Sequence, residues 1–219
     1  MSQGVLTISS RNYGSWSLRG SLLCSMAGLD IEERVLPPDD ASARAELLHL
    51  SPSFLVPRLE YDGAAVWGVL AIAEFLNELA PNAWLLPHDR VTRAHCRSIS
   101  GEMHQGFSNL RSAMPMNLRA HYPGFKVFVG AQADIDRILS IWSGCLRAYG
   151  GPFLFGAAPT MADAMFAPVC TRFATYDVKL PSDCAAYSTL ILGMPAMVKW
   201  KEAALLEQDE IEMLDTGDF

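Results

Sequence analysis

Residues 57–67 read PRLEYDGAAVW, two short β-like runs on either side of the turn dipeptide Asp62-Gly63. An Asp-Gly pair between two such runs is typical of a tight antiparallel hairpin. Beyond the hairpin, apolar side chains recur at helical spacing over residues 69–79, and Pro81 stands just past them. The segment therefore predicts a strand, a tight turn, a second strand and a helix.

Two further strands and two helices are predicted upstream of this hairpin. Residues 5–8 form a β-branched run, and residues 31–36 form a second β-like run. Ser15 is placed to cap the helix between them, which Gly28 ends, and another helix is predicted over residues 40–49. The order β-α-β-α-β-β-α is that of a small α/β domain with a mixed four-stranded sheet.

The chain changes character after the third predicted helix. Residues 81–88 form a linker bracketed by prolines, and the chain beyond them reads as helices separated by Pro and Gly. Long helical patterns run over residues 90–114 and 134–149. We therefore predict an α/β domain over residues 1–80 and an all-helical domain with an acidic tail over residues 89–219.

One helix of the second domain has a marked start. Thr160-Met161-Ala162-Asp163 has the spacing of a capping box, in which each of the two outer side chains bonds to the backbone N–H of the other residue. The following residues 164–174 are mostly apolar, so we expect this helix at the centre of the helical bundle. Pro181 and Pro195 precede two further short helices.

Charge and hydropathy exclude several classes of protein. Lys and Arg number 17 against 24 Asp and Glu, a net charge of −7 that offers no basic footprint for nucleic acid. Six of the acids lie in Glu207–Phe219, which carries no base and is expected to be a solvated tail. No segment has the roughly 18 uncharged apolar residues of a membrane span, and the N-terminus lacks a leader pattern. We expect a cytoplasmic protein with neither nucleic acid nor membrane as a partner.

Cysteine spacing argues against a disulfide framework and against a metal site. The five cysteines are an odd number, lie far apart, and never form a Cys-x-x-Cys pair. They are predicted to be small hydrophobic residues in a reducing compartment. His95 and Glu102 lie seven residues apart without a third ligand at suitable spacing, so no metal is expected as a cofactor.

Four motifs, in this order and spacing, resemble the glutathione S-transferase superfamily. They are Asn12–Arg19 after the first strand, Val56-Pro57 before the third, Val66–Ile72 at the start of the third helix, and the Thr160–Asp163 cap. The resemblance spans essentially the whole chain. It implies a thioredoxin-like N-terminal domain followed by a helical one, a homodimer, and glutathione as a co-substrate bound with a small molecule between the domains.

In that superfamily, the loop after the first strand activates the thiol of glutathione. A free thiol has a pKa of about 8.5, and a hydrogen-bond donor together with a helix N-terminus can lower it by a unit or more. The resemblance implies that Ser15 or Asn12 stabilises the thiolate, with Tyr13 and Ser17 in reserve if the alignment shifts. A second interpretation stays open, in which Ser15 only caps the helix and Asn12 only caps the turn.

The remaining glutathione contacts depart from the family pattern. The resemblance implies a cis bond at Val56-Pro57 that presents the Val56 backbone to the peptide part of glutathione. Gly68-Val69 stands where relatives usually place an acid or Gln followed by Ser, and Phe54-Leu55 stands where they often place Gly-Lys. Each lost hydrogen bond to a charged group is worth about 1.5–3 kcal/mol, so these changes predict weak glutathione binding or a different thiol at Leu55, Val56, Pro57, Gly68 and Val69.

Four apolar residues on the first long helical pattern allow two interpretations. Met103, Phe107, Leu110 and Met114 recur at helical spacing and either line the pocket for an electrophile or belong to the bundle core. Two functions follow from the whole pattern. The first is thiol transfer to or from a small hydrophobic electrophile, and the alternative is a binding or assembly protein that kept the fold and no longer uses glutathione.

Overall fold

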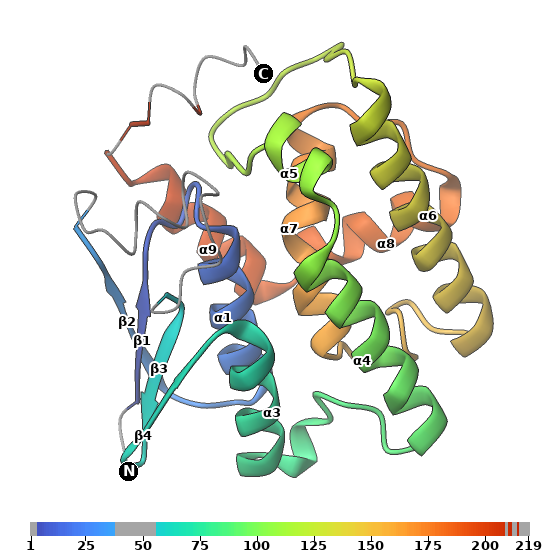
Figure 1. Cartoon of the computed structure of the whole chain (residues 1–219). Coiled ribbons are helices and arrows are strands. Elements are labelled where there is room, and N and C mark those ends of the chain that lie inside the picture. The colour runs from blue at the N-terminus through green and yellow to red at the C-terminus, as the bar shows by residue number, and fades with distance from the viewer. Residues whose placement is uncertain (1–3, 38–55, 209, 212–213, 215–219) are drawn as a thin grey trace.

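The N-terminal part of the molecule is built on a mixed four-stranded sheet. The computed structural model describes residues 4–37, 56–208, 210–211 and 214, so the helix predicted over residues 40–49 lies outside it. The strands are β1 (Gly4–Ile8), β2 (Ile31–Val35), β3 (Arg58–Tyr61) and β4 (Ala64–Trp67). They lie in the order β2-β1-β3-β4, with β1 and β2 parallel and the other two pairs antiparallel (Figure 1). The predicted mixed sheet is confirmed.

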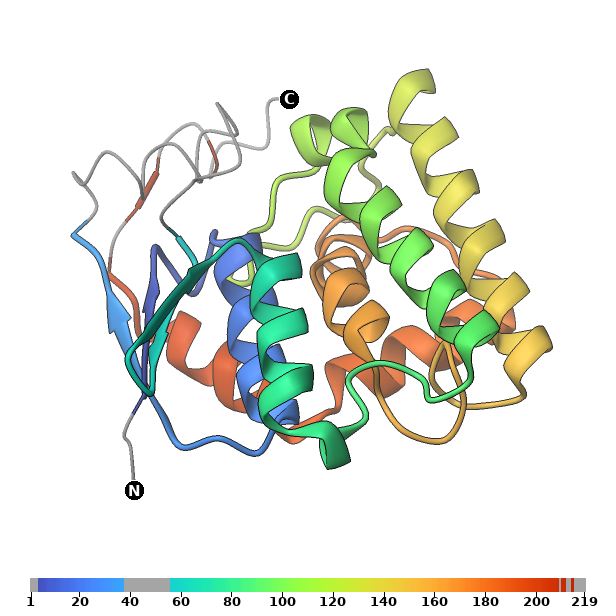
Figure 2. The same ribbon diagram turned by 60° about the horizontal axis from the view of Figure 1, so that its bottom comes forward.

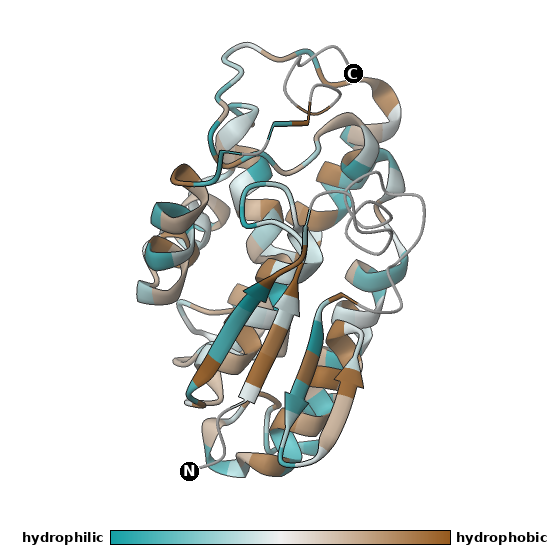
Figure 3. Ribbon diagram, turned by 90° about the vertical axis from the view of Figure 1, so that its left-hand side faces the viewer, coloured by the Kyte–Doolittle hydropathy of each residue, from teal (hydrophilic) through white to brown (hydrophobic). Residues whose placement is uncertain are grey.

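The predicted hairpin joins β3 and β4. Its two turn residues, Asp62 and Gly63, have φ angles of 49° and 79°. Positive φ at both central residues matches the twist of the flanking strands, which is why Asp-Gly is favoured there. On β3 the hydrophilic Arg58 and Glu60 alternate with the buried Leu59, whereas β1 and β4 are mostly hydrophobic. Figure 3 shows the four strands from the outer face of the sheet, coloured by hydropathy.

Two helices cover the inner face of the sheet, α1 (Ser15–Met26) and α3 (Val69–Leu79). Both lie between the sheet and the rest of the molecule (Figures 1 and 2). The N-cap of α1 is Gly14 and not Ser15, and no side chain caps this helix end. A Cβ atom on residue 14 would lie 2.3 Å from the Ser10 carbonyl oxygen, so the tight loop requires glycine at the cap position. The prediction of Ser15 as the helix cap is therefore wrong.

The C-terminal part of the described chain is helical. A 3₁₀ turn over Pro81–Ala83 leads into α4 (Arg90–Gln105), α5 (Ser108–Ala113), α6 (Val129–Tyr149), α7 (Met161–Thr175), α8 (Ser182–Leu192) and α9 (Pro195–Leu205). The helix α7 lies at the centre, as predicted, and nearly all of its residues are buried. The Thr160–Asp163 capping box at its start is also present. None of the helices in this described part is long and apolar enough to cross a membrane.

One predicted helix is divided in two. The pattern over residues 90–114 breaks at Gly106-Phe107, where Phe107 takes a left-handed φ of 59° and buries its ring. A Cβ atom at position 106 would lie 2.8 Å from the Glu102 carbonyl oxygen, so glycine is required at this close approach. The result is a change of direction between α4 and α5. Likewise, α6 begins at Val129, before the predicted residue 134.

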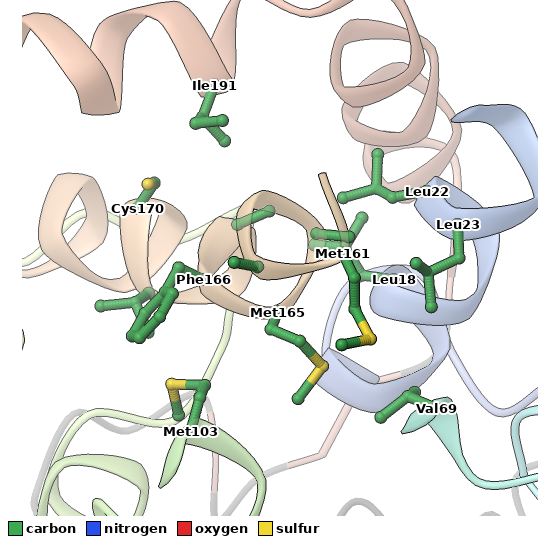
Figure 4. Close-up of a cluster of buried hydrophobic side chains, with 14 of the residues drawn as sticks. Leu18, Leu22, Leu23, Val69, Met103, Met161, Met165, Phe166, Cys170 and Ile191 are labelled. Atoms are coloured by element: carbon green, nitrogen blue, oxygen red, sulfur yellow. The ribbon is translucent and has the colours of Figure 1, made fainter. Parts of the chain in front are cut away.

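The two parts of the molecule share one hydrophobic core. Figure 4 shows Met161, Met165 and Phe166 of α7 between Leu18 and Leu22 of α1 on one side and side chains of the helical part on the other. All of these side chains are buried. Because the core is continuous, the loop that precedes α1 is held at a fixed position relative to the helical part.

Candidate functional site

Asn12 lies in the loop that joins β1 to α1 and is completely buried. Its side-chain oxygen Oδ1 accepts hydrogen bonds from the backbone N–H groups of Leu118 and Arg119, at 2.8 and 3.0 Å. Its nitrogen Nδ2 donates to Oδ1 of Asn117 at 3.1 Å. The side chain therefore ties the loop to the helical part, and one of the two Nδ2 hydrogens takes no part in these bonds.

The other three residues considered for stabilising the thiolate, Ser15, Tyr13 and Ser17, differ in their hydrogen-bond partners. Ser15 is the first residue of α1 and is buried at the positive end of that helix. The Tyr13 hydroxyl accepts hydrogen bonds from Nη2 of Arg119 at 2.9 Å and from the Ile211 N–H at 3.4 Å. Ser17 Oγ accepts the Ser9 N–H at 3.1 Å and so helps to fix the end of β1. Tyr13 and Ser17 are thus bonded to neighbouring segments.

The bond between Val56 and Pro57 is cis, as the family resemblance implied. The Pro57 carbonyl accepts the Gly68 N–H at 3.3 Å, which connects it to the start of α3. On its other side Pro57 packs against α1, where a Cβ atom on Gly20 would lie 2.9 Å from the proline Cβ. The second turn of α1 and the start of α3 therefore both contact Pro57 of the cis peptide. Leu55 lies outside the described residues.

The start of α3 offers backbone donors without side chains to assist them. Gly68 is the N-cap residue, with a φ of 81°, and makes no side-chain bond because it has no side chain. The first turn holds no acidic residue, and Val69 is buried. The N–H groups of a first helical turn have no partner within the helix and can bind an anion. The first turn of α3 therefore has backbone donors and no acidic side chain beside them, and a role in binding glutathione stays a prediction.

Two arginines and a histidine surround Trp16, and sequence reasoning missed this cluster. The guanidinium carbons of Arg19 and Arg111 lie 4.4 and 5.7 Å from the indole centroid, and the His104 ring lies at 5.0 Å. Burial lowers the pKa of His104, and the charges of Arg19 and Arg111 lower it further. Burial also lowers the pKa of Arg111. A negatively charged group of a ligand placed beside this cluster is stabilised by it.

The predicted pocket residues Met103, Phe107 and Met114 lie in the hydrophobic core that the two parts share. Met103 and Met114 are completely buried, and Phe107 is 7% exposed. Their positions favour the interpretation as core. A contact with an electrophile stays a prediction for all three.

Burial disfavours the reactive thiolate form of all five cysteines. All five are free and buried, which agrees with their prediction as small hydrophobic residues. Burial raises the pKa of Cys24 and of Cys96 to about 12 and that of Cys145 to about 11. Any thiol chemistry of this chain therefore needs a thiol from a ligand. In the described ranges, His, Cys, Asp and Glu do not gather into a group that could hold a metal ion.

The first residue of the acidic tail is docked and not solvated. The Glu207 carboxylate accepts hydrogen bonds from Ser10 Oγ at 2.8 Å and from the N–H groups of Arg11 and Asn12 at 2.7 and 3.1 Å. The expectation of a solvated tail is therefore wrong for this residue. The acidic composition of the segment suggested solvation, and no local pattern relates it to a loop almost two hundred residues away.

Comparisons with known families agree with this architecture. Residues 13–79 match the model of the glutathione S-transferase N-terminal domain, and residues 118–200 match that of the C-terminal domain. A thioredoxin-like domain followed by a helical one is the arrangement of that family. This chain belongs to the glutathione S-transferase family.

Individual relatives resemble the chain over most of its length. A probable maleylacetoacetate isomerase of Caenorhabditis elegans is 28% identical over 160 residues, 73% of each chain. The maleylacetoacetate isomerase of Rattus norvegicus is 27% identical over 173 residues, 78% of each chain. A glutathione transferase homologue from Burkholderia, solved with bound glutathione, has a TM-score of 0.69 at 22% identity and covers 94% of this chain and 100% of its own.

A further solved structure is the maleylacetoacetate isomerase of Anaeromyxobacter dehalogenans with bound dicarboxyethyl glutathione and citrate. It has a TM-score of 0.66 at 23% identity and covers 96% of this chain and 95% of its own. At such identities, these structures establish the fold that the chain shares with them.

Proposed function

We propose that the protein is a glutathione-dependent enzyme that transfers a thiol to or from a small electrophile bound between its two domains. The observation that carries the proposal is the contact of both α1 and the start of α3 with Pro57 of the cis Val56–Pro57 bond. This arrangement offers backbone groups to a peptide-like ligand. In this proposal Ser15 stabilises the thiolate at the start of α1, and Asn12 fixes the loop and donates its remaining amide hydrogen.

Reversible addition of the thiol is the step that we infer. The thiolate forms a bond to one carbon of an activated double bond, and a proton is added to the other carbon. Loss of the same two groups, after rotation about the resulting single bond, returns the thiol and leaves the isomerised double bond. The curated relatives named maleylacetoacetate isomerase support such a step. If the thiol is not lost again, the product is a conjugate.

The electrophile that fits best carries a carboxylate as well as an apolar part. The guanidinium groups of Arg19 and Arg111 beside Trp16 favour an anionic group there, since Arg111 is half-buried. This extends the expectation of a purely hydrophobic electrophile. Met103 and Phe107, on α4 and in the bend that follows it, offer the apolar surroundings.

Gly68-Val69 supports weak binding of glutathione. The first turn of α3 keeps its backbone donors but has no hydroxyl for the γ-glutamyl carboxylate and no acid for the ammonium group. The same feature favours the second candidate, a binding or assembly protein that does not turn over glutathione. A direct assay separates the two.

That assay offers the enzyme reduced glutathione with two electrophiles of matched size, a cis-unsaturated acid and its methyl ester, and follows both by proton NMR. We expect glutathione-dependent isomerisation or conjugation, faster for the acid than for the ester. Absence of any glutathione-dependent change with either compound, at millimolar glutathione, would favour the non-catalytic candidate. Equal rates would contradict the role of the two arginines beside Trp16.

We also propose that the chain forms a homodimer and works in the cytoplasm. Four large apolar side chains are exposed on consecutive elements, Trp67, Leu79, Trp84 and Val91. An interface between two copies would cover such residues. Five free buried cysteines fit a reducing compartment. We expect light scattering to give twice the mass of 24.0 kDa, and Val91→Glu to shift it to the monomer.

A further inference from the structure

Glu207 holds the backbone of the loop on which the proposed thiol chemistry depends. Its carboxylate accepts hydrogen bonds from the Arg11 and Asn12 N–H groups and from the Ser10 hydroxyl. At the same point Trp200 of α9 donates its Nε1–H to the Arg11 carbonyl at 2.8 Å. Both polar groups of the Arg11 backbone are therefore bonded to the C-terminal part of the chain.

The charge of Glu207 is accommodated where it lies. The side chain is 13% exposed, and Nη1 of Arg11 lies 4.0 Å from its carboxylate. Arg11 itself is fixed by Glu33 of β2, at 3.0 Å. Hydrogen bonds to a charged acceptor in such a partly buried place are stronger than those between neutral groups. Glu207 is thus a largely buried and fully hydrogen-bonded residue and not a solvated one.

The segment beyond Glu207 contacts the same loop a second time. Ile211 and Leu214 pack against Tyr13, and the Ile211 N–H reaches the Tyr13 hydroxyl. Asn117 donates from Nδ2 to the Leu214 carbonyl at 3.3 Å. The described residues of this segment therefore lie against both the first loop and residue 117, which in turn accepts from Asn12.

These contacts determine what the loop can offer to a ligand. The N–H groups of Arg11 and Asn12 are directed at Glu207, so they are not available to a thiolate. The hydrogen bond from the Asn12 N–H to Glu207 fixes the peptide plane between Arg11 and Asn12. The Asn12 side chain is fixed by its hydrogen bonds with residues 117–119. Loss of the carboxylate would leave the Arg11 N–H without its acceptor and the Asn12 N–H with only the Ser10 hydroxyl, and so would loosen the loop.

We propose that Glu207 is a positioning residue for the thiolate-stabilising loop and acts through the backbone of Arg11 and Asn12 without touching the substrate. The inference rests on the proposed function, because it assigns to this loop the activation of a ligand thiol. Glu207 thereby supports the site from outside the hydrophobic core that the two parts share.

The test compares Glu207→Gln with Glu202→Gln, which removes the same charge from an exposed position on α9. Glu207→Asp keeps the charge on a shorter side chain and serves as a second variant. We expect the amide hydrogens of Arg11 and Asn12 to exchange about tenfold faster in Glu207→Gln and unchanged in Glu202→Gln. Glutathione-dependent kcat should fall about tenfold in Glu207→Gln with KM within threefold, and Glu207→Asp should recover part of it.

Unchanged exchange in Glu207→Gln would overturn the inference, as would an effect of equal size in Glu202→Gln. A rise in KM with unchanged kcat would overturn it too, because that pattern indicates lost binding of substrate instead of lost positioning. If the wild-type protein shows no glutathione-dependent turnover, the proposed function fails and the catalytic part of the inference with it. The hydrogen exchange then still decides whether Glu207 fixes the loop.

Discussion

Asp163 and Glu207 both accept several hydrogen bonds, but they stabilise different kinds of structure. Asp163 is buried at the start of α7 and accepts bonds from the N–H and hydroxyl of Thr160, the Leu154 N–H and the Tyr187 hydroxyl, at 2.7–3.1 Å. All of these donors belong to the helical part. Glu207 instead takes its three donors from the loop of the other part.

Asp163 stabilises the helical bundle, whereas Glu207 fixes the loop of the candidate site. Burial raises the pKa of Asp163, while its hydrogen bonds from Thr160, Leu154 and Tyr187 act in the opposite direction. A buried carboxylate with satisfied bonds is a stability element, and its removal leaves several buried donors without partners. Glu207 lies outside the hydrophobic core, and its hydrogen bonds orient the loop of Ser10, Arg11 and Asn12.

Asp163→Ala is expected to have the largest effect on folding. It deprives the buried donors of Thr160, Leu154 and Tyr187 of their acceptor, so we expect a loss of about 3–5 kcal/mol in the free energy of unfolding. Thr160→Ala removes one of those donors and part of the cap, for about 1–2 kcal/mol. Urea denaturation measures both. Unchanged midpoints together with altered ligand binding would place this cap in the site instead of the core.

Asn12→Ala tests whether Asn12 links the two parts. The Leu118 N–H loses its acceptor, and the Arg119 N–H keeps only Asn117 Oδ1, so we expect a loss of about 2–4 kcal/mol in the free energy of unfolding. Asn82→Ala, at an exposed residue of the 3₁₀ turn, is the matched control and should stay within about 0.5 kcal/mol. A stable Asn12→Ala protein that has lost turnover would make Asn12 a purely catalytic residue.

Ser15→Ala tests the thiolate role at the start of α1. Stabilising the reacting thiolate matters most on the way to the transition state, so we expect kcat to fall about 10- to 100-fold with little change in KM. Ser98→Ala removes a hydroxyl from an exposed helical position on α4 and should leave the rate unchanged. An unaltered rate in Ser15→Ala would remove this residue from the proposed mechanism.

Local sequence patterns predicted most of the fold. The predictions that were wrong concern helix boundaries that are determined by tertiary contacts. The hairpin, β1, β2, α3 and the α7 cap follow from residues within one turn or strand of each other. Phe107 continues the apolar spacing of Met103, so the sequence indicates one helix, yet burial of the Phe107 ring in a left-handed conformation divides it. Gly14 and Ser15 are both good cap residues, and only the approach to Ser10 selects the glycine.

Only those parts of the candidate site that depend on short sequence motifs were predictable. The cis bond at Val56-Pro57 and the bare first turn of α3 follow from short motifs. The cluster around Trp16 joins side chains of α1, α4 and α5, and no spacing in the sequence relates Arg19 to His104 or Arg111. The Glu207 contact has the same origin, since its donors lie at the opposite end of the chain.

Calorimetric titration with reduced glutathione tests the central claim, that this site binds glutathione but binds it weakly. We expect a dissociation constant well above the low micromolar range for the wild-type protein. The double variant Gly68→Glu, Val69→Ser supplies the side chains that are missing at the start of α3. It strains the backbone at residue 68, whose φ is 81°, and should still bind about tenfold more tightly. Binding in the low micromolar range by the wild type would contradict weak binding, and no binding by either protein would contradict the glutathione-dependent function itself.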